Sequence, residues 1–149
     1  MRAVIQRVSR ACVRVDAATR GEIGAGLVAL VSVGEDDAED DARTLAEKIV
    51  GLRIFRDESG LMNRSVLETN AAILLVSQFT LHGDARKGRR PSFIAAAGET
   101  LARPLYELTG RLIERTGVRT QYGEFGAQME VELVNDGPVT ILLDTKRTF

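Results

Sequence analysis

The spacing of apolar residues divides the first half of the chain into strands and one helix. Residues 2–8 and 11–16 predict two strands, because in the second one polar side chains alternate with alanine and valine. Residues 24–33 form a mostly apolar run, which is typical of a strand buried on both faces. The acidic segment 36–41 favours a helix start, and apolar residues then follow helical spacing over 45–52.

The second half continues the mixture of strands and helices. Residues 71–79 predict another buried strand, and 82–92, rich in glycine and basic residues, predict an exposed loop. Leucines recur at spacings of four, three and four over 99–116, which predicts an amphipathic helix. Pro104 favours a regular helix start close to it, and Gly117 is a natural stop.

Two further strands are expected near the C-terminus. Over 129–133 apolar residues alternate with two glutamates, which predicts a half-exposed strand, and 139–143 predicts a final strand. Residues 135–138 would connect them. Because strands and helices do not alternate regularly, an α+β fold is favoured over a doubly wound parallel sheet.

Composition restricts the function classes. The 149 residues suit one domain, expected to span 1–149. The net charge of −1 provides no global basic field, so nucleic-acid binding needs a local patch. One cysteine, Cys12, and one histidine, His82, make a zinc site improbable within one chain. With no secretory signal and no apolar run long enough for a membrane span, a cytoplasmic protein is expected.

Common catalytic and cofactor motifs are missing from the sequence. There is no phosphate-binding loop, dinucleotide fingerprint, zinc-protease helix or nucleophile elbow. A Ser–His–Asp triad could use only His82, and Asp84 is too close in sequence to orient its ring, so a simple loop histidine is the plainer interpretation. Cys12 is read as a small packed hydrophobe. We expect neither a metal nor a cofactor.

Ser77-Gln78-Phe79-Thr80-Leu81 ends a predicted buried strand, where polar residues tend to face a crevice. The alternative is that Ser77 and Thr80 only satisfy nearby backbone groups. Thr80 has no evident base beside it, which argues against a side-chain nucleophile.

A compact basic segment follows at once. Arg86, Lys87, Arg89 and Arg90 put four cations within five residues. Beside a pocket, such a patch suits a phosphate-bearing substrate, and arginine favours bidentate phosphate contacts. A solvated loop is the alternative.

Asn135-Asp136-Gly137-Pro138-Val139-Thr140 lies between the last two predicted strands. Alone it indicates a plain hairpin connection. Only about 5–6% of X-Pro bonds in folded proteins are cis, so the residues by themselves do not justify a cis bond.

Taken together, these segments resemble the D-aminoacyl-tRNA deacylases, first named for D-tyrosyl-tRNA. The resemblance runs from the opening Met-Arg-Ala-Val-Ile-Gln-Arg-Val through 77–81, 87–93 and 125–127 to 135–140. Either of the motifs at 77–81 and 135–140 would be weak alone, but their pairing is highly specific. The expected architecture is a single α+β domain with a mixed, strongly curved β-sheet core and peripheral helices.

The resemblance implies an enzyme that hydrolyses the ester of D-aminoacyl-tRNA, and also of mischarged glycyl-tRNA. It implies a homodimer in which Gly137-Pro138, as a Gly-cisPro element, enters the partner's pocket. Backbone carbonyls there would exclude an L side chain and leave a D side chain pointing outward.

The resemblance also assigns site residues. The catalytic segment would comprise Ser77, Gln78, Phe79 and Thr80, with backbone N–H groups around Phe79 and Thr80 as the oxyanion site. Thr80 is the natural nucleophile candidate, although a positioning or water-orienting role is preferred. The other implied site residues are Phe125 against the terminal adenine, Met129 lining the pocket, Arg7 holding the Gly-Pro element, and Lys87, Arg89 and Arg90 on the tRNA.

Plainer roles and rival functions stay open at this point. Phe125 suits a core position equally well, an inward strand methionine such as Met129 is more often core, and Arg7 suits a surface strand. A non-catalytic tRNA-binding module would use the basic segment and show salt-dependent affinity without turnover. A small-molecule esterase would use Thr80 or Ser77 as a nucleophile and would be trapped covalently on activated esters.

Overall fold

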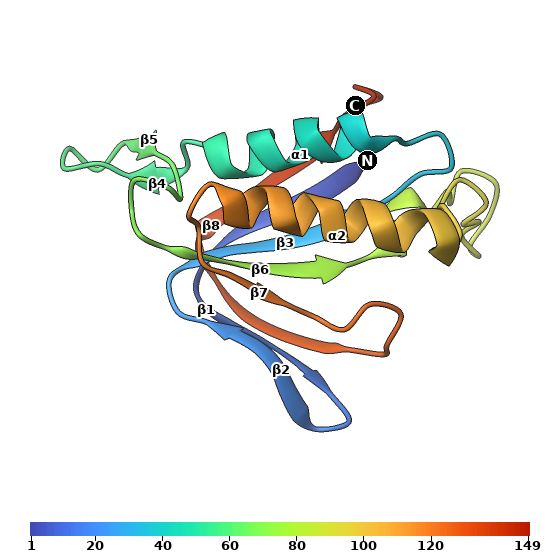
Figure 1. The fold of residues 1–149 in the computed structure, drawn as a ribbon, viewed down its shortest axis with the longest axis horizontal. Helices are drawn as coiled ribbons and strands as arrows, with labels where there is room; N and C mark the ends of the chain where they lie inside the picture. The colour runs from blue at the N-terminus through green and yellow to red at the C-terminus, as the bar shows by residue number, and fades with distance from the viewer.

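One long strand, β1, is the centre of the sheet in the computed structural model, which describes all 149 residues (Figure 1). Its 14 residues are enough to pair with three other strands. The elements, in chain order, are β1 (Arg2–Val15), β2 (Ala18–Ile23), β3 (Gly26–Ser32), α1 (Glu39–Gly51), β4 (Phe55–Arg56), β5 (Met62–Arg64), β6 (Ala72–Ser77), the 3-10 turn η1 (Phe79–His82), α2 (Glu99–Arg115), β7 (Thr120–Tyr122) and β8 (Glu130–Asp144).

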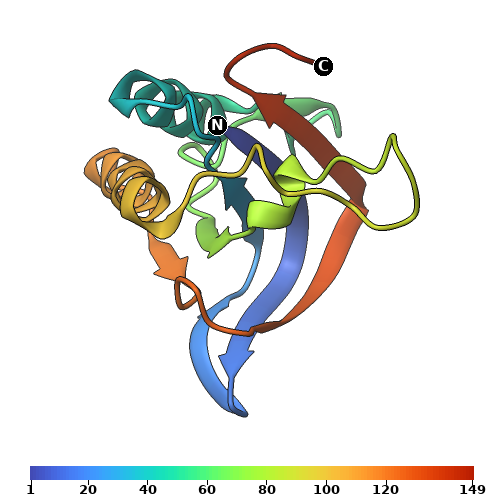
Figure 2. The same cartoon turned by 90° about the vertical axis from the view of Figure 1, so that its right-hand side faces the viewer.

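The main sheet is mixed and strongly curved. Its order is β2-β1-β3-β6-β7, with β8 paired to β1 as well, while β4 and β5 form a separate ribbon. β1 runs antiparallel to β2, β3 and β8, whereas β6 runs parallel to both β3 and β7. Figure 2 shows the sheet curling, with β1, β2 and β8 bending away from the helices. The predicted α+β class, with a curved mixed sheet and peripheral helices, is confirmed.

The two helices lie side by side over one face of the sheet (Figure 1). α1 begins with three acidic residues at its positive N-terminal end. Its apolar stripe, which includes Leu45 and Ile49, is fully buried. α2 contributes Leu105 and Ile113 to the same core. Helical spacing of apolar residues therefore predicted the packed face of α1. For α2 it predicted only part of the packed face, because Leu105 is buried, Leu108 and Leu112 are half-buried, and Leu101 is exposed.

β6 separates two apolar clusters and is buried on both faces, as its unbroken apolar run indicates. Ile73 and Leu75 pack in the larger cluster beneath the helices, and Leu74 and Val76 pack in the smaller one on the opposite face. Because β3 and β6 are parallel, their carboxyl ends emerge at the same edge of the sheet. That edge carries the candidate site.

Three expectations about strands and connections were wrong. The separate strands over 2–8 and 11–16 are one continuous strand, because β1 keeps pairing with β8 through two register shifts. Likewise 135–138 is not a connection but part of β8. The buried strand expected over 71–79 ends at Ser77, and the chain then turns into η1.

Two further expectations were wrong in detail. Pro104 lies inside α2 rather than near its start. It is tolerated because Pro104 and Thr100, whose carbonyl loses its helical partner, are both exposed to water. His82 was placed in the exposed loop, but it is buried at the end of η1, with 9% of its surface exposed. Neither helix is long and apolar enough to cross a membrane.

Candidate active site

The parallel ends of β3 and β6 bring the first site residues together. Val31 of β3 pairs with Ser77 of β6, and the Gln78 N–H donates to the Val31 carbonyl at 2.7 Å. The neighbouring Ser32 is therefore beside the start of η1. Sequence reasoning found Ser77 and Gln78 but missed Ser32, whose signal was its position at the end of a second buried strand.

The turn η1 presents unused backbone donors. The Leu81 N–H donates to the Gln78 carbonyl at 3.2 Å, whereas the N–H groups of Phe79 and Thr80, the first two of η1, have no partner within the turn. Both residues are exposed. Adjacent free N–H groups are the donors that an oxyanion site requires.

The hydroxyl of Thr80 has one polar partner. The Gln78 side-chain amide donates to Thr80 Oγ1 at 2.5 Å. This bond occupies the oxygen as an acceptor and leaves the hydroxyl proton free to be donated. No histidine, carboxylate or amine lies within hydrogen-bonding distance to remove that proton, so the geometry suits a hydrogen-bond donor better than an activated nucleophile.

An apolar cavity of about 370 Å³ opens next to η1. Eleven of its 16 lining residues are hydrophobic, and the polar ones are few, as in sites for small organic groups. Ser77, Gln78 and Phe79 line it together with Phe125 and Met129. Five of the predicted site residues are thus brought to one cavity.

The ring of Phe125 is held between two neighbours. Its centroid lies 5.6 Å from that of Tyr106, and the Arg103 guanidinium lies 4.6 Å from it on a face of the ring. Glu99 orients Arg103 through an ion pair at 2.6 Å. The burial of Tyr106 raises its pKa well above the ordinary value. The phenol is therefore neutral, and it donates to the Leu75 carbonyl at 2.9 Å.

Arg7 and the Gly137-Pro138 element meet elsewhere, outside the cavity lining. Gln6 pairs with Thr140 and Val8 with Asn135, so residues 136–139 bulge outward opposite Arg7 alone. The side chain of Arg7 is buried. Its Nε lies 3.2 Å from the Asp136 carbonyl and 3.0 Å from an Asp136 carboxylate oxygen.

The bulge has a defined geometry. The Asn135 side chain bridges it by donating to the Val139 carbonyl at 3.0 Å and accepting from the Val139 N–H at 3.1 Å. The Gly137–Pro138 peptide bond is cis, as the resemblance implied. Both residues are exposed. Gly137 has a φ of +134°, and an added Cβ would lie 2.7 Å from Val139 Cγ2, so only glycine fits.

The basic segment lies in the loop directly after η1. An isolated bridge between Asp84 and Ser92 closes this loop. Asp84 binds Arg86 at 2.7 Å, and these contacts hold the pKa of the Asp84 carboxyl well below its usual range. Three of the four cations, Lys87, Arg89 and Arg90, have no carboxylate partner within 4 Å and remain exposed.

His82 is surrounded by charges of both signs. Burial is the largest cause that lowers its pKa below the ordinary 6.5, and the positive charges of Arg2 and the Met1 α-amine lower it further. The carboxylates of Asp37 and Asp144 act in the opposite direction. The net shift keeps the imidazole neutral at neutral pH.

This shift predicts an acid-sensitive stability. The unfolded chain takes up a proton on His82 near pH 6.5, whereas the folded chain resists it until lower pH. The free energy of unfolding should therefore be highest above pH 6.5 and fall as the pH drops below it. We expect the Tm to decrease over this window in the wild type and much less in His82→Asn. Equal pH slopes for the two proteins would contradict this assignment.

A second pH range, in which Asp41 titrates, provides an internal control for the stability measurements. Burial alone raises the pKa of Asp41, but hydrogen bonds from Thr145, Lys146 and the Ala38 N–H outweigh it and lower the pKa to about 2. The stability from this carboxylate is present above pH 3.8 and is lost as the pH falls toward 2. Wild type and His82→Asn should lose it alike.

Comparisons with known proteins identify first a class and then a family. Curated relatives that align over their full length with this chain are deacylases, and the chain is accordingly a hydrolase. The sequence model described as D-Tyr-tRNA(Tyr) deacylase matches residues 4–144, and the chain belongs to this family. The resemblance drawn from the motifs is thus confirmed.

The relatives are close and complete. The D-aminoacyl-tRNA deacylases of Koribacter versatilis and Anaeromyxobacter dehalogenans are 58% and 56% identical over 149 residues, which is 100% of each chain. The solved structure of the c-Myc DNA Unwinding Element Binding Protein superposes with a TM-score of 0.92 at 38% identity, covering 97% of this chain and 99% of that one. A probable eukaryotic D-amino acid tRNA deacylase shares the fold, with a TM-score of 0.82 at 18% identity.

Proposed function

We propose that this chain hydrolyses the ester bond of D-aminoacyl-tRNA and of mischarged glycyl-tRNA. The observation that carries the proposal is the pair of N–H groups at the start of η1 that lack a partner within the turn, next to an apolar cavity that Phe79 lines. Membership of the deacylase family supplies the substrate class. The name of the closely similar relatives specifies D-aminoacyl-tRNA.

Hydrolysis of this substrate requires little catalytic assistance from the protein. An aminoacyl ester is far easier to hydrolyse than a peptide, and the neighbouring ribose 2′-hydroxyl can assist the attack of water. In the proposed mechanism the N–H groups of Phe79 and Thr80 stabilise the negative charge that develops on the carbonyl oxygen of the ester when water attacks. The Thr80 hydroxyl, which the Gln78 side chain orients, donates a hydrogen bond that positions the ester or the attacking water.

The apolar cavity would hold the terminal adenosine. Phe125 offers an aromatic surface for base stacking, and Arg103 and Tyr106 fix its plane. Met129 lines the same wall. Ser77 adds a hydroxyl group to the lining at the sheet edge, where the ribose would approach.

Chirality would be set by a second copy of the chain. In the proposed homodimer, Gly137-Pro138 of one protomer enters the partner's cavity and excludes L side chains. Three observations support this role. The element projects from β8, it is exposed, and it lies outside the cavity of its own chain. Arg7 supports the base of the projection from beneath.

The loop after η1 would bind the tRNA backbone. Lys87, Arg89 and Arg90 are the cations without carboxylate partners, and they follow the catalytic turn by a few residues. Phosphates near the 3′ end of the acceptor strand would therefore meet them while the ester lies at η1.

The test is whether the purified protein releases free D-tyrosine from D-tyrosyl-tRNA over many turnovers. We expect turnover without a covalent acyl-protein in mass spectra of quenched reactions. Binding of tRNA without turnover would instead indicate a non-catalytic module. Turnover through a trapped acyl-Thr80 would overturn the positioning role proposed for that residue.

A further inference from the structure

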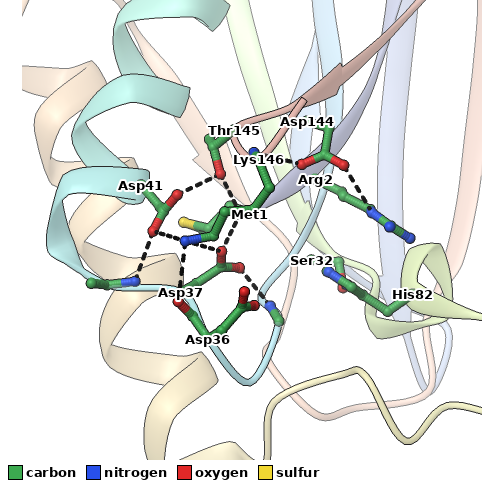
Figure 3. A network of polar contacts seen from close by, with 12 residues as sticks. Met1, Arg2, Ser32, Asp36, Asp37, Asp41, His82, Asp144, Thr145 and Lys146 are labelled. Carbon is green, nitrogen blue, oxygen red and sulfur yellow. Dashed lines mark hydrogen bonds and ion pairs between the residues drawn. The ribbon is translucent and has the colours of Figure 1, made fainter. Parts of the chain in front are cut away.

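Ser32 and His82 form a buried polar pair directly behind η1 (Figure 3). Ser32 Oγ lies 2.6 Å from His82 Nδ1 and 3.3 Å from the Phe79 carbonyl oxygen. Only 2% of Ser32 and 9% of His82 is exposed. Both contacts are satisfied together when the His82 Nδ1–H donates to Ser32 and the Ser32 hydroxyl donates to the carbonyl.

The acceptor of this chain belongs to the catalytic turn. The carbonyl of Phe79 and the N–H of Thr80 are the two ends of one peptide group, which is planar and trans. They therefore point in opposite directions. A hydroxyl that holds the carbonyl toward the protein interior directs the Thr80 N–H outward, toward an ester bound at η1.

The loop beside His82 is itself held by hydrogen bonds. The Gly34 N–H donates to Asp37 at 2.6 Å, and the other oxygen of Asp37 accepts from the Met1 α-amine at 2.5 Å (Figure 3). An added Cβ on Gly34 would lie 3.0 Å from His82 Nε2, so this loop passes close to the ring and leaves no room for a side chain. Arg2 holds the same turn from its other end by donating to the Leu81 carbonyl at 3.1 Å.

We propose that Ser32 and His82 are positioning residues that aim the Thr80 N–H at the developing oxyanion. The inference rests on the proposed function and adds two residues to it that touch neither substrate nor the reacting atoms. In this arrangement the pair raises the rate of the chemical step and contributes little to substrate affinity, because a well-aimed donor matters most when charge develops.

The first variant is Ser32→Ala. We expect its kcat for D-tyrosyl-tRNA to fall about tenfold with KM changed less than about twofold, since a donor is misaligned rather than removed. Ser65→Ala is the matched control. Ser65 is another buried hydroxyl, bonded to Glu68 at 2.8 Å. It directly follows β5, which forms a separate two-stranded ribbon with β4 (Figure 1). This control should lower stability without changing kcat.

His82 supplies a second and independent variant pair. Asparagine places an N–H close to the position of Nδ1, so His82→Asn should retain most of the wild-type kcat. His82→Leu removes the donor and should match Ser32→Ala. The double variant Ser32→Ala/His82→Leu should be no slower than either single variant, because both break one chain of hydrogen bonds.

The possible outcomes separate the two proposals. An active wild type together with an unchanged kcat in Ser32→Ala overturns the positioning role and leaves the proposed function standing. A wild type that binds tRNA but releases no D-tyrosine overturns the proposed function itself. If Ser32→Ala does not fold, the comparison of His82→Asn with His82→Leu decides, since equal kcat values in these two variants overturn the positioning role.

Discussion

Replacing Thr80 with proline should lower kcat for D-aminoacyl-tRNA about 100- to 1,000-fold, the usual effect of losing one oxyanion donor. Proline has no N–H, and the Thr80 N–H has no partner within η1, so no backbone bond of the turn is lost. The variant also loses the contact from the Gln78 side chain to Thr80 Oγ1, which Thr80→Ala measures separately. Position 80 is the second residue of η1, where the missing N–H of proline breaks no bond of the helical ladder. We therefore expect KM for the tRNA and the Tm to change little.

Thr80→Ala separates the hydroxyl from the N–H. It keeps the backbone donor and loses only the side-chain oxygen that Gln78 binds. We expect a fall in kcat of about tenfold, equal to about 1.4 kcal/mol of transition-state stabilisation. Complete loss of turnover in Thr80→Ala with tRNA binding retained would contradict this account and favour a nucleophilic threonine.

Replacing Gly26 with alanine should lower the free energy of unfolding more than any other substitution proposed for this protein. An added Cβ would lie 2.0 Å from the carbonyl oxygen of Ala72, which is backbone and cannot swing away. Gly26 and Ala72 begin the parallel pairing of β3 with β6. Separating these strands should cost about 3–5 kcal/mol, which is a large part of the 5–15 kcal/mol of a typical domain. Urea unfolding followed by circular dichroism measures this loss.

Gly24→Ala is the matched control for that variant. The same methyl group is added two residues earlier, where nothing lies within 4 Å. Its free energy of unfolding should stay within about 0.5 kcal/mol of the wild type. Equal stability losses in the two variants would show that the close approach of β3 and β6 at Gly26 is not the cause.

Much of the fold follows from local pattern. The unbroken apolar run of β6 indicated a strand buried on both faces, and the leucine spacing over 99–116 indicated the helix α2, although only Leu105 of its leucines is buried. The continuity of β8 did not follow, because Asn135-Asp136-Gly137-Pro138 has the composition of a turn. Pairing with β1 on both sides of Arg7 keeps the strand continuous, and this long-range pairing leaves no local signal.

The site could be predicted where its residues are consecutive. Ser77 to Thr80 form one segment at a strand end, so the sequence identified them together. Ser32 and His82 are 50 residues apart and meet only because β3 and β6 are parallel neighbours. Arg7 suited a surface strand as well as a buried support, and only the packed bulge of β8 distinguishes them.

The most direct test compares D-tyrosyl-tRNA with L-tyrosyl-tRNA, each incubated at equal concentration with the purified protein and with a protein-free blank. The account predicts fast loss of the D ester and loss of the L ester at the blank rate. Equal loss of both esters would remove the chiral role proposed for Gly137-Pro138. Loss of the D ester at the blank rate would contradict the hydrolysis assigned to η1.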